Sequence, residues 1–347
     1  MRVGDLLILK GNEILSLLAG QERELLQVVR AAYLAHAGGD SSLPHSTFLR
    51  FPQEQRNRII ALPAYLGDEF GMAGIKWISS FPGNLEKGLE RASAVLILNS
   101  IETGRPEAIL EGSIISAKRT AASAALAAQV LQPGEQTTVA GLVGCGLINF
   151  EIARFLLSSC PRIERFLIHD IDAVRAEQFR SQCRNAFAGI EVEVVEEMGQ
   201  VFEKSKLVSL ATTAAAPHIF DLSRCAPGST ILHISLRDLS PEVILTCDNV
   251  VDEVDHVCRA QTSVHLAEQV AGNRDFIRCT LADVLGQKAD ARRDEESITI
   301  FSPFGLGVLD IAVGKLVCEL GLEQQKGTII QSFMPENWME RKSEIRA

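Results

Sequence analysis

The chain has 347 residues, of which 46% are hydrophobic and 22% are charged, and its formal net charge is −10. This length accommodates two domains with a sizeable core, and the composition is typical of a globular protein. An acidic chain lacks the excess of Lys and Arg that neutralises phosphates, which argues against a nucleic-acid surface. No apolar run approaches the length of a membrane span, so we expect no membrane insertion.

Eight cysteines are scattered singly along the sequence, and none forms a Cys-x-x-Cys pair or a Cys/His cluster with metal-ligand spacing. We therefore expect reduced thiols and no metal site. The N-terminus reads Met-Arg-Val-Gly-Asp and lacks a basic segment followed by an apolar one, so we expect no export signal. Together these features predict a cytoplasmic protein.

The first 131 residues predict three helices and a group of strands. Helices are expected at 13–18, 22–37 and 116–131, the last rich in alanine. Strands are expected at 6–9, 47–51, 58–64, 72–79, 93–99 and 108–110. Because no long helical crossover separates most of these strands, we expect a mostly antiparallel sheet. Residues 132–136 contain Pro and Gly and are expected to form a linker.

From residue 137 onward, strands alternate with helices. Strands are expected at 137–143, 166–168, 191–195, 207–210, 230–234, 249–254 and 298–301. Helices are expected at 148–157, 173–187, 199–204, 264–270, 281–285 and 308–320. This alternation predicts an α/β protein with a doubly wound parallel sheet of the Rossmann type.

A glycine-rich turn, Gly-Cys-Gly at 144–146, joins the apolar strand 137–143 to a helix. Glycines let the backbone turn tightly and approach a pyrophosphate, which the helix N-terminus then favours. Asn149 stands where the dinucleotide-binding motif has its third glycine. An ordinary glycine turn without a cofactor is the alternative. The candidate cofactor contacts of this turn are Gly144, Gly146, Leu147 and Ile148.

Two further positions could contact the cofactor. Asp170 follows the strand 166–168, where a carboxylate accepts hydrogen bonds from both ribose hydroxyls and repels a 2′-phosphate. This favours NAD over NADP. Thr212 and Thr213 follow the strand 207–210 and could hydrogen-bond the cofactor, although threonine is also common in turns.

A nucleotide fold without a metal cluster or a nucleophile motif indicates hydride transfer, for which the protein supplies binding and proton transfer. Lys76 lies inside an apolar strand, and burial would lower its pKa and suit it to acid–base catalysis. Alternatively, its ammonium reaches solvent. Asp238 follows the strand 230–234, at the sheet edge where ligands bind, and could accept a proton. A helix-capping role is the alternative.

Four arginines are candidates for binding a carboxylate. Arg119 interrupts an Ala-rich helix, and its guanidinium suits a substrate carboxylate or a cofactor phosphate. An exposed helical arginine is the alternative. Arg50 and Arg58 flank the second pair of predicted strands, and Arg91 precedes the next strand. Each could also bind a carboxylate, although single arginines usually lie at the surface.

Several segments carry a resemblance to a known family. They are Gly-Ile-Lys-Trp at 74–77, Asn-Ser-Ile-Glu-Thr-Gly-Arg-Pro at 99–106, Arg-Thr-Ala-Ala at 119–122, the glycine turn and Asp238. With these, nearly the whole chain resembles the ornithine cyclodeaminase/mu-crystallin family. The resemblance implies a homodimer, a substrate-binding and dimerisation domain at 1–131 and 302–347, and an NAD-binding Rossmann domain at 132–301. It also implies that Thr120 contacts the cofactor pyrophosphate.

Three more segments resemble one group within this family: 58–63, 90–93 and 302–305. Members of this group oxidise N-(1-amino-1-carboxy-2-ethyl)-glutamate with NAD and hydrolyse it to 2,3-diaminopropionate and 2-oxoglutarate, for siderophore or antibiotic biosynthesis. The resemblance implies Lys76 and Asp238 as acid–base catalysts. It implies substrate-carboxylate contacts for Arg50, Arg91 and Arg119, and a PLP-dependent synthase as the pathway partner.

Other activities on the same fold remain alternatives. Cyclodeaminases carry a substrate-binding Glu where this chain has Ile60, which argues against ornithine as the substrate. Reduction of ketimines or other imines is a second alternative. A non-catalytic, crystallin-like nucleotide-binding protein is a third, and the presence of Lys76 and Asp238 favours an enzyme over it.

Overall fold

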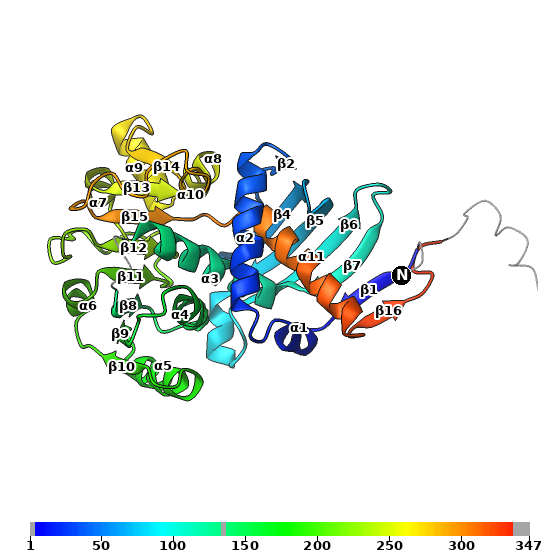
Figure 1. The fold of residues 1–347 in the computed structure, drawn as a ribbon, viewed down its shortest axis with the longest axis horizontal. Helices are drawn as coiled ribbons and strands as arrows, with labels where there is room; N and C mark the ends of the chain where they lie inside the picture. Colours follow the sequence, from blue (N-terminus) through cyan, green and yellow to red (C-terminus); the bar gives the residue numbers. More distant parts are fainter. Residues whose placement is uncertain (1–3, 133–136, 336–347) are drawn as a thin grey trace, which may run out of the picture. The chain divides into compact units, whose positions relative to one another are not determined.

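The computed structural model describes residues 4–132 and 137–335. The chain divides into two compact units, each built on an eight-stranded sheet (Figure 1). Unit 1 comprises Met1–Gln21, Gly38–Ser116 and Gly307–Ala347, and unit 2 comprises Glu22–Ala37 and Ala117–Leu306. The division into a substrate-binding and dimerisation domain at 1–131 and 302–347 and an NAD-binding domain at 132–301 stays a prediction. Apart from Gln132, the predicted linker lies outside the described residues.

The sheet of unit 1 has the strand order β16-β1-β7-β6-β5-β4-β2, and β3 also pairs with β4. All its pairs are antiparallel except β1 with β7, as the sequence predicted. Its strands are β1 (Leu6–Leu9), β2 (Ser41–Ser42), β3 (Thr47–Phe51), β4 (Glu54–Leu66), β5 (Met72–Ser80), β6 (Ala92–Ser100), β7 (Pro106–Glu111) and β16 (Thr328–Ile330). Its helices are α1 (Gly11–Leu17), the 3-10 helix η1 (Pro82–Lys87) and α11 (Gly307–Glu323).

One face of this sheet is covered by α11, which packs on β4, β5 and β6 (Figure 1). Side chains alternate between the two faces of a strand, so every second residue of β6 points toward the helix. Accordingly, Ala94, Leu96 and Leu98 are buried, whereas Val95, between Ala94 and Leu96, is 41% exposed. The α11 side is therefore the hydrophobic core of unit 1, and the other face is open in the described chain.

Unit 2 contains the predicted doubly wound sheet, with every strand pair parallel in the order β10-β9-β8-β11-β12-β15-β13-β14. Its strands are β8 (Val139–Val143), β9 (Arg165–His169), β10 (Glu191–Val194), β11 (Leu207–Leu210), β12 (Thr230–His233), β13 (Asp248–Val251), β14 (Ile277–Thr280) and β15 (Thr299–Ser302). Its helices are α2 (Glu22–Ala37), α3 (Gly112–Leu131), α4 (Leu147–Ser159), α5 (Ala173–Ala186), α6 (Met198–Lys204), α7 (Pro241–Thr246), α8 (Val254–Val257), α9 (Ser263–Ala271) and α10 (Leu281–Leu285).

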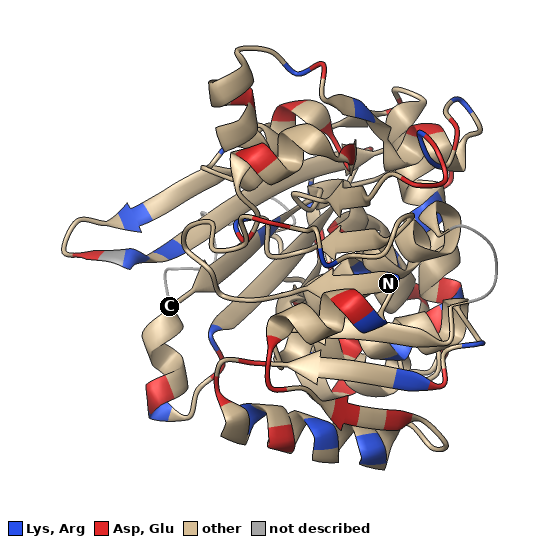
Figure 2. Ribbon diagram, turned by 90° about the vertical axis from the view of Figure 1, so that its left-hand side faces the viewer, with Lys and Arg blue, Asp and Glu red and all other residues tan. Residues whose placement is uncertain are grey.

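The central strands of unit 2 are buried on both faces, as expected of a parallel sheet covered by helices. Lys and Arg residues are interspersed with Asp and Glu residues along the described elements (Figure 2). Among the described helices, none is long and apolar enough to cross a membrane. The eight cysteines are free thiols, and the described residues contain no group of three or more His, Cys, Asp or Glu that could hold a metal ion.

Candidate active site

The glycine turn connects β8 to α4 in unit 2, as the sequence predicted. Gly144 has a φ of +93°, and a Cβ added there would lie 2.5 Å from the Ala211 carbonyl oxygen. Only glycine fits this position. Gly146 is the N-cap of α4, and no side chain caps the helix there. The first amides of α4, from Leu147 and Ile148 onward, can therefore meet an anion such as a pyrophosphate.

Asn149 connects this turn to the sheet through side-chain hydrogen bonds. Its Nδ2 donates hydrogen bonds to the carbonyl oxygens of Val143 (2.8 Å) and Gly144 (2.7 Å). Its Oδ1 accepts a hydrogen bond of 2.7 Å from the Ser209 hydroxyl on β11. Asn149 is completely buried. The side chain that departs from the glycine motif thus holds the turn in place, a role that the sequence did not reveal.

Asp170 follows β9 beside the same turn. Its Oδ2 accepts the Cys145 amide at 2.7 Å, and its Oδ1 accepts the Asp172 amide at 3.0 Å. Each carboxylate oxygen retains a lone pair that can accept a hydroxyl proton. A glycine turn, an uncapped helix start and a fixed carboxylate together fit a dinucleotide with a free ribose. Thr120, the other expected pyrophosphate contact, lies half-buried on α3.

Asp238 is buried in a cluster of polar side chains at the carboxyl ends of β11 and β12. The hydroxyls of Thr212 and Ser235 donate hydrogen bonds to its Oδ1 and Oδ2, respectively. The Nε2 of His218 lies 3.1 Å from Oδ1, and that of His233 lies 3.4 Å from Oδ2. Thr213 is adjacent and exposed. The structure therefore brings predicted Thr212 and Asp238 together and adds Ser235, His218 and His233, which the sequence did not single out.

The cluster determines the charge of Asp238. Burial raises the pKa of this carboxyl, but hydrogen bonds from His233, Ser235 and Thr212 outweigh burial and hold the pKa well below its ordinary value. The Asp238 amide donates a hydrogen bond of 3.2 Å to His233 Nε2, so this nitrogen is engaged as an acceptor. The hydroxyls of Thr212 and Ser235 are therefore the main donors to the carboxylate. A carboxylate held in this way stays ionised at neutral pH.

The turn that carries Asp238 is strained and braced. Leu236 has a φ of +69°, which costs a residue with a side chain about 1 kcal/mol or more. The Leu236 carbonyl accepts the Ser263 amide at 2.7 Å, and Arg237 donates to the Ala260 carbonyl at 2.8 Å. Such strain is common at functional sites, where surrounding contacts maintain it.

Lys76 lies on the α11 face of β5 in unit 1 and is only 2% exposed. Its Nζ donates hydrogen bonds to Asp310 Oδ2 at 2.7 Å and to Ser116 Oγ at 3.0 Å. Asp310 comes from the first turn of α11 and is also buried. The alternative of a solvent-reaching lysine is therefore wrong. Asp310 was missed because 234 residues separate it from its partner.

Arg119 is buried on α3 in unit 2, with 8% of its surface exposed, so the alternative of an exposed helical arginine is wrong. Gly305 has a φ of +92°, and a Cβ there would lie 2.8 Å from Arg119 Nη1. Asp252 accepts the amides of Phe304 and Gly305 at 2.9 and 2.7 Å. Burial raises the pKa of Asp252 to about 6, against the effect of these amides and of the Arg119 charge. The Arg119 guanidinium therefore lies beside the Gly305 turn, within reach of the charge of Asp252.

Arg50 lies on β3 directly opposite Arg58 on β4. Like charges in opposed positions repel one another, so an anion between them would be stabilising. Arg58 and Leu62 share one face of β4, and Leu62 is paired with Lys76, so both arginines belong to the face that carries Lys76. Arg91 precedes β6 and is half-buried, which lowers its pKa.

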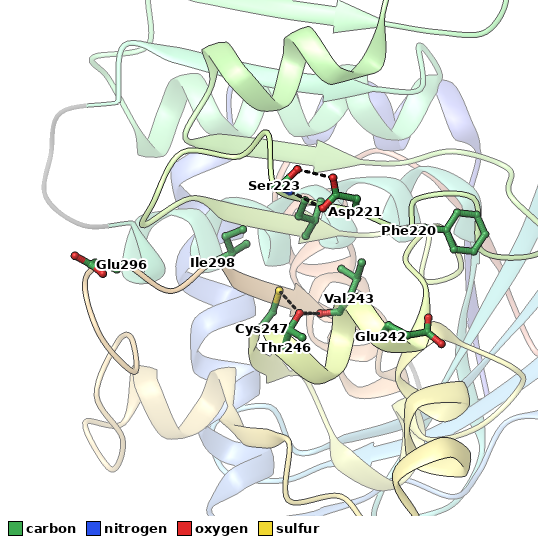
Figure 3. Close-up of a pocket in the computed structure, with 10 residues that line it drawn as sticks. Phe220, Asp221, Ser223, Glu242, Val243, Thr246, Cys247, Glu296 and Ile298 are labelled. Carbon is green, nitrogen blue, oxygen red and sulfur yellow. Dashed lines mark hydrogen bonds between the residues drawn. The ribbon is translucent and has the colours of Figure 1, made fainter.

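Two pockets lie apart from most of these residues. A pocket of ≈ 470 Å³ in unit 2 is lined by residues 220–223, α7 and the segment before β15, and none of the predicted site residues lines it (Figure 3). A pocket of ≈ 330 Å³ in unit 1 is lined by Gly74, Ile75 and Asn99, from two of the segments that carry the family resemblance, among other residues.

Similar proteins agree with this architecture. An alanine dehydrogenase from Archaeoglobus fulgidus is 29% identical over 340 residues, which is 95% of this chain and 99% of the relative. An N-((2S)-2-amino-2-carboxyethyl)-L-glutamate dehydrogenase from Staphylococcus aureus is 27% identical over 335 residues, again 95% and 99%. These two relatives differ in substrate at nearly equal identity.

Solved structures confirm the fold class. The Δ(1)-pyrroline-2-carboxylate reductase of Thermococcus litoralis, in complex with NADH and L-proline, has a TM-score of 0.87 and 26% identity, covering 93% of this chain and 99% of that one. An archaeal alanine dehydrogenase dimer with bound NAD has a TM-score of 0.84 and 28% identity, covering 94% and 99%. Both cofactors lack the 2′-phosphate, in agreement with the NAD expected here.

The family resemblance is confirmed by a model of the whole family. The model described as the ornithine cyclodeaminase/mu-crystallin family matches residues 10–325, which include the glycine turn, Lys76 and Asp238. The chain belongs to the ornithine cyclodeaminase/mu-crystallin family.

Proposed function

We propose that the protein oxidises N-(1-amino-1-carboxy-2-ethyl)-glutamate with NAD and hydrolyses the product to 2,3-diaminopropionate and 2-oxoglutarate. The observation that carries this proposal is the opposed pair of Arg50 and Arg58 on the face of Lys76. A substrate with three carboxylates needs several fixed guanidinium groups, and these two add to buried Arg119 and half-buried Arg91. Ile60 lies between Arg58 and Leu62 on the same face, where it offers no carboxylate to the amine of ornithine.

The residues that we assign to NAD binding lie in unit 2. We propose that the glycine turn and the first amides of α4 bind the pyrophosphate with Thr120, and that Asp170 binds the adenosine ribose. Thr212 and Thr213 would lie toward the nicotinamide, at the carboxyl end of β11. When bound, NAD would accept the hydride from the glutamate α-carbon and leave an iminium group on the substrate.

The residues of the chain then supply the hydrolysis. Lys76, fixed by Asp310 and Ser116, interacts with the substrate as a charged proton donor. Asp238 and the polar side chains around it form the second acid–base group. The turn at Leu236 holds this cluster in position. Arg50, Arg91 and Arg119 bind the carboxylates and exclude substrates that lack them.

A direct assay tests this proposal. Purified protein would be mixed with NAD and the glutamate conjugate, and NADH absorbance, 2-oxoglutarate and 2,3-diaminopropionate would be measured together. We expect all three products in equal amounts, and little NADPH when NADP replaces NAD. Ornithine, alanine and proline serve as comparison substrates. Turnover of one of these without turnover of the conjugate would contradict the proposal.

A second candidate is oxidation of a simple amino acid or reduction of the corresponding imine. The observation in its favour is that an alanine dehydrogenase is 29% identical to this chain, and the conjugate dehydrogenase is 27% identical. Alanine carries one carboxylate, so this candidate gives no role to the opposed arginines. The same assay separates the two candidates.

We also propose that the open face of the unit 1 sheet forms a homodimer. Trp77 and Val95 are paired there and are 43% and 41% exposed, respectively. An exposed apolar face of this kind is typical of an interface between subunits, and one archaeal relative is a dimer. We expect a dimeric mass by light scattering, and a shift toward monomer for Trp77→Glu. A wild-type monomer would contradict the proposal.

A further inference from the structure

His218 lies between β11 and β12, beside the buried carboxylate of Asp238. Its side chain is 42% exposed, whereas that of Asp238 is 0% exposed. The two are joined twice: the His218 amide donates to the Asp238 carbonyl at 2.9 Å, and the ring Nε2 lies 3.1 Å from Asp238 Oδ1. The position of the imidazole is therefore fixed by main chain and side chain together.

These contacts determine which ring nitrogen of His218 carries the proton. An ionised carboxylate only accepts hydrogen bonds, so His218 Nε2 must donate to Asp238. In the neutral ring, Nδ1 then holds a free lone pair. Among the described residues, none forms a hydrogen bond with Nδ1. A partly exposed ring with a basic nitrogen and a carboxylate behind it is the arrangement of a general base.

The other members of the cluster are unsuited to this task. Asp238 is enclosed, both its oxygens accept hydroxyl protons, and its pKa is held low. His233 is 0% exposed, its Nε2 faces the Asp238 amide, and its Nδ1 lies 3.2 Å from Ser302 Oγ. With both nitrogens engaged, His233 is a structural histidine. His218 is the one titratable side chain of this cluster that solvent or substrate can reach.

We propose that His218 carries the proton in the hydrolytic step and that Asp238 acts through it as a positioning residue. The proposal rests on the proposed function. Nδ1 removes a proton from water as the water oxygen bonds to the iminium carbon, and the C=N π electrons move to nitrogen. The imidazolium, stabilised by Asp238, returns this proton to the amine nitrogen. The C–N bond then breaks with its electrons going to nitrogen, and the hydroxyl loses its proton to solvent as the ketone forms.

The test separates hydride transfer from hydrolysis. His218→Gln keeps an amide that can donate to Asp238 but cannot carry a proton. We expect NADH formation in the first turnover at close to the wild-type rate, and steady-state turnover lower by about 10²–10⁴-fold. Asp238→Asn should show the same split, with hydride transfer kept and hydrolysis slowed, because the imidazolium loses its carboxylate.

Controls make the result decisive. His265→Gln changes a half-buried histidine on α9 outside the cluster and should leave turnover unchanged. NAD affinity measured by calorimetry should be the same in wild type and His218→Gln, which shows that the variant is folded. Equal steady-state turnover in wild type and His218→Gln would overturn the role of His218 alone. A wild-type protein that reduces no NAD with the conjugate would overturn the proposed function and this role with it.

Discussion

Lys76→Met is expected to abolish turnover and to lower the stability of the protein by about 3–5 kcal/mol. Removing one partner of a buried ion pair leaves the other charge without compensation, and Asp310 is as deeply buried as Lys76. The loss of a fixed acid–base group costs a further ~10²–10⁴-fold in rate for the protein that remains folded. Urea unfolding and NADH formation, measured on the same samples below the unfolding transition, give both numbers.

Two variants separate stability from catalysis at this pair. The double variant Lys76→Met/Asp310→Leu replaces the pair by apolar side chains, which is often neutral or stabilising, so stability should recover while turnover does not. Lys118→Met breaks another buried pair, Lys118–Glu151 at 3.0 Å in unit 2, and should lower stability without abolishing turnover. A catalytic role for Lys76 would be refuted by turnover that recovers together with stability in the double variant.

Asn149→Ala is expected to weaken NAD binding by at least about tenfold and to destabilise unit 2. The substitution removes two donors to the glycine turn and the acceptor for the Ser209 hydroxyl. Each buried polar group left without a partner costs about 1–3 kcal/mol. The tenfold loss of affinity corresponds to about 1.4 kcal/mol and reflects a turn that is no longer held in the binding conformation.

Ser209→Ala is the matched control for Asn149. It removes one of the three hydrogen bonds and leaves both contacts between Asn149 and the turn. We expect a modest loss of stability, about 1–3 kcal/mol, and unchanged NAD affinity by calorimetry. If Asn149→Ala binds NAD as tightly as wild type, the side chain serves stability only, and its role in shaping the cofactor site is wrong.

The two sheet types could be predicted because local patterns encode them. Buried apolar strands separated by helices distinguish unit 2, and strands joined by short turns distinguish unit 1. The strands β2, β14 and β16 were missed. β2 and β16 have two and three residues, and β16 is exposed throughout, so neither carries an apolar pattern. β14 has four half-buried residues with no alternation between apolar and polar faces in their burial. The pairing of β16 with β1 joins the two ends of unit 1 and has no local signal.

The site residues were predictable as types and positions, but their partners were not. Lys76 stands out as a charge in an apolar strand, whereas Asp310 is an ordinary acidic residue near a helix start until the fold brings them together. The same holds for Asp238, since His218 precedes it by 20 residues in a segment without regular structure. Asn149 looked like a defect in a motif because its hydrogen-bond partners come from the strand end and from β11.

The small strand β16 has a consequence for solubility. Its three residues pair antiparallel with β1, whose side chains are almost entirely buried. Without this cover, β1 would be an edge strand with unpaired amides and carbonyls, and such edges promote association between chains. β16, which now forms the edge of the sheet, is short and follows Lys326 in the chain. A short edge strand and a nearby lysine both discourage further pairing. β16 thus covers an edge of the unit 1 sheet at which pairing between chains would otherwise be favoured.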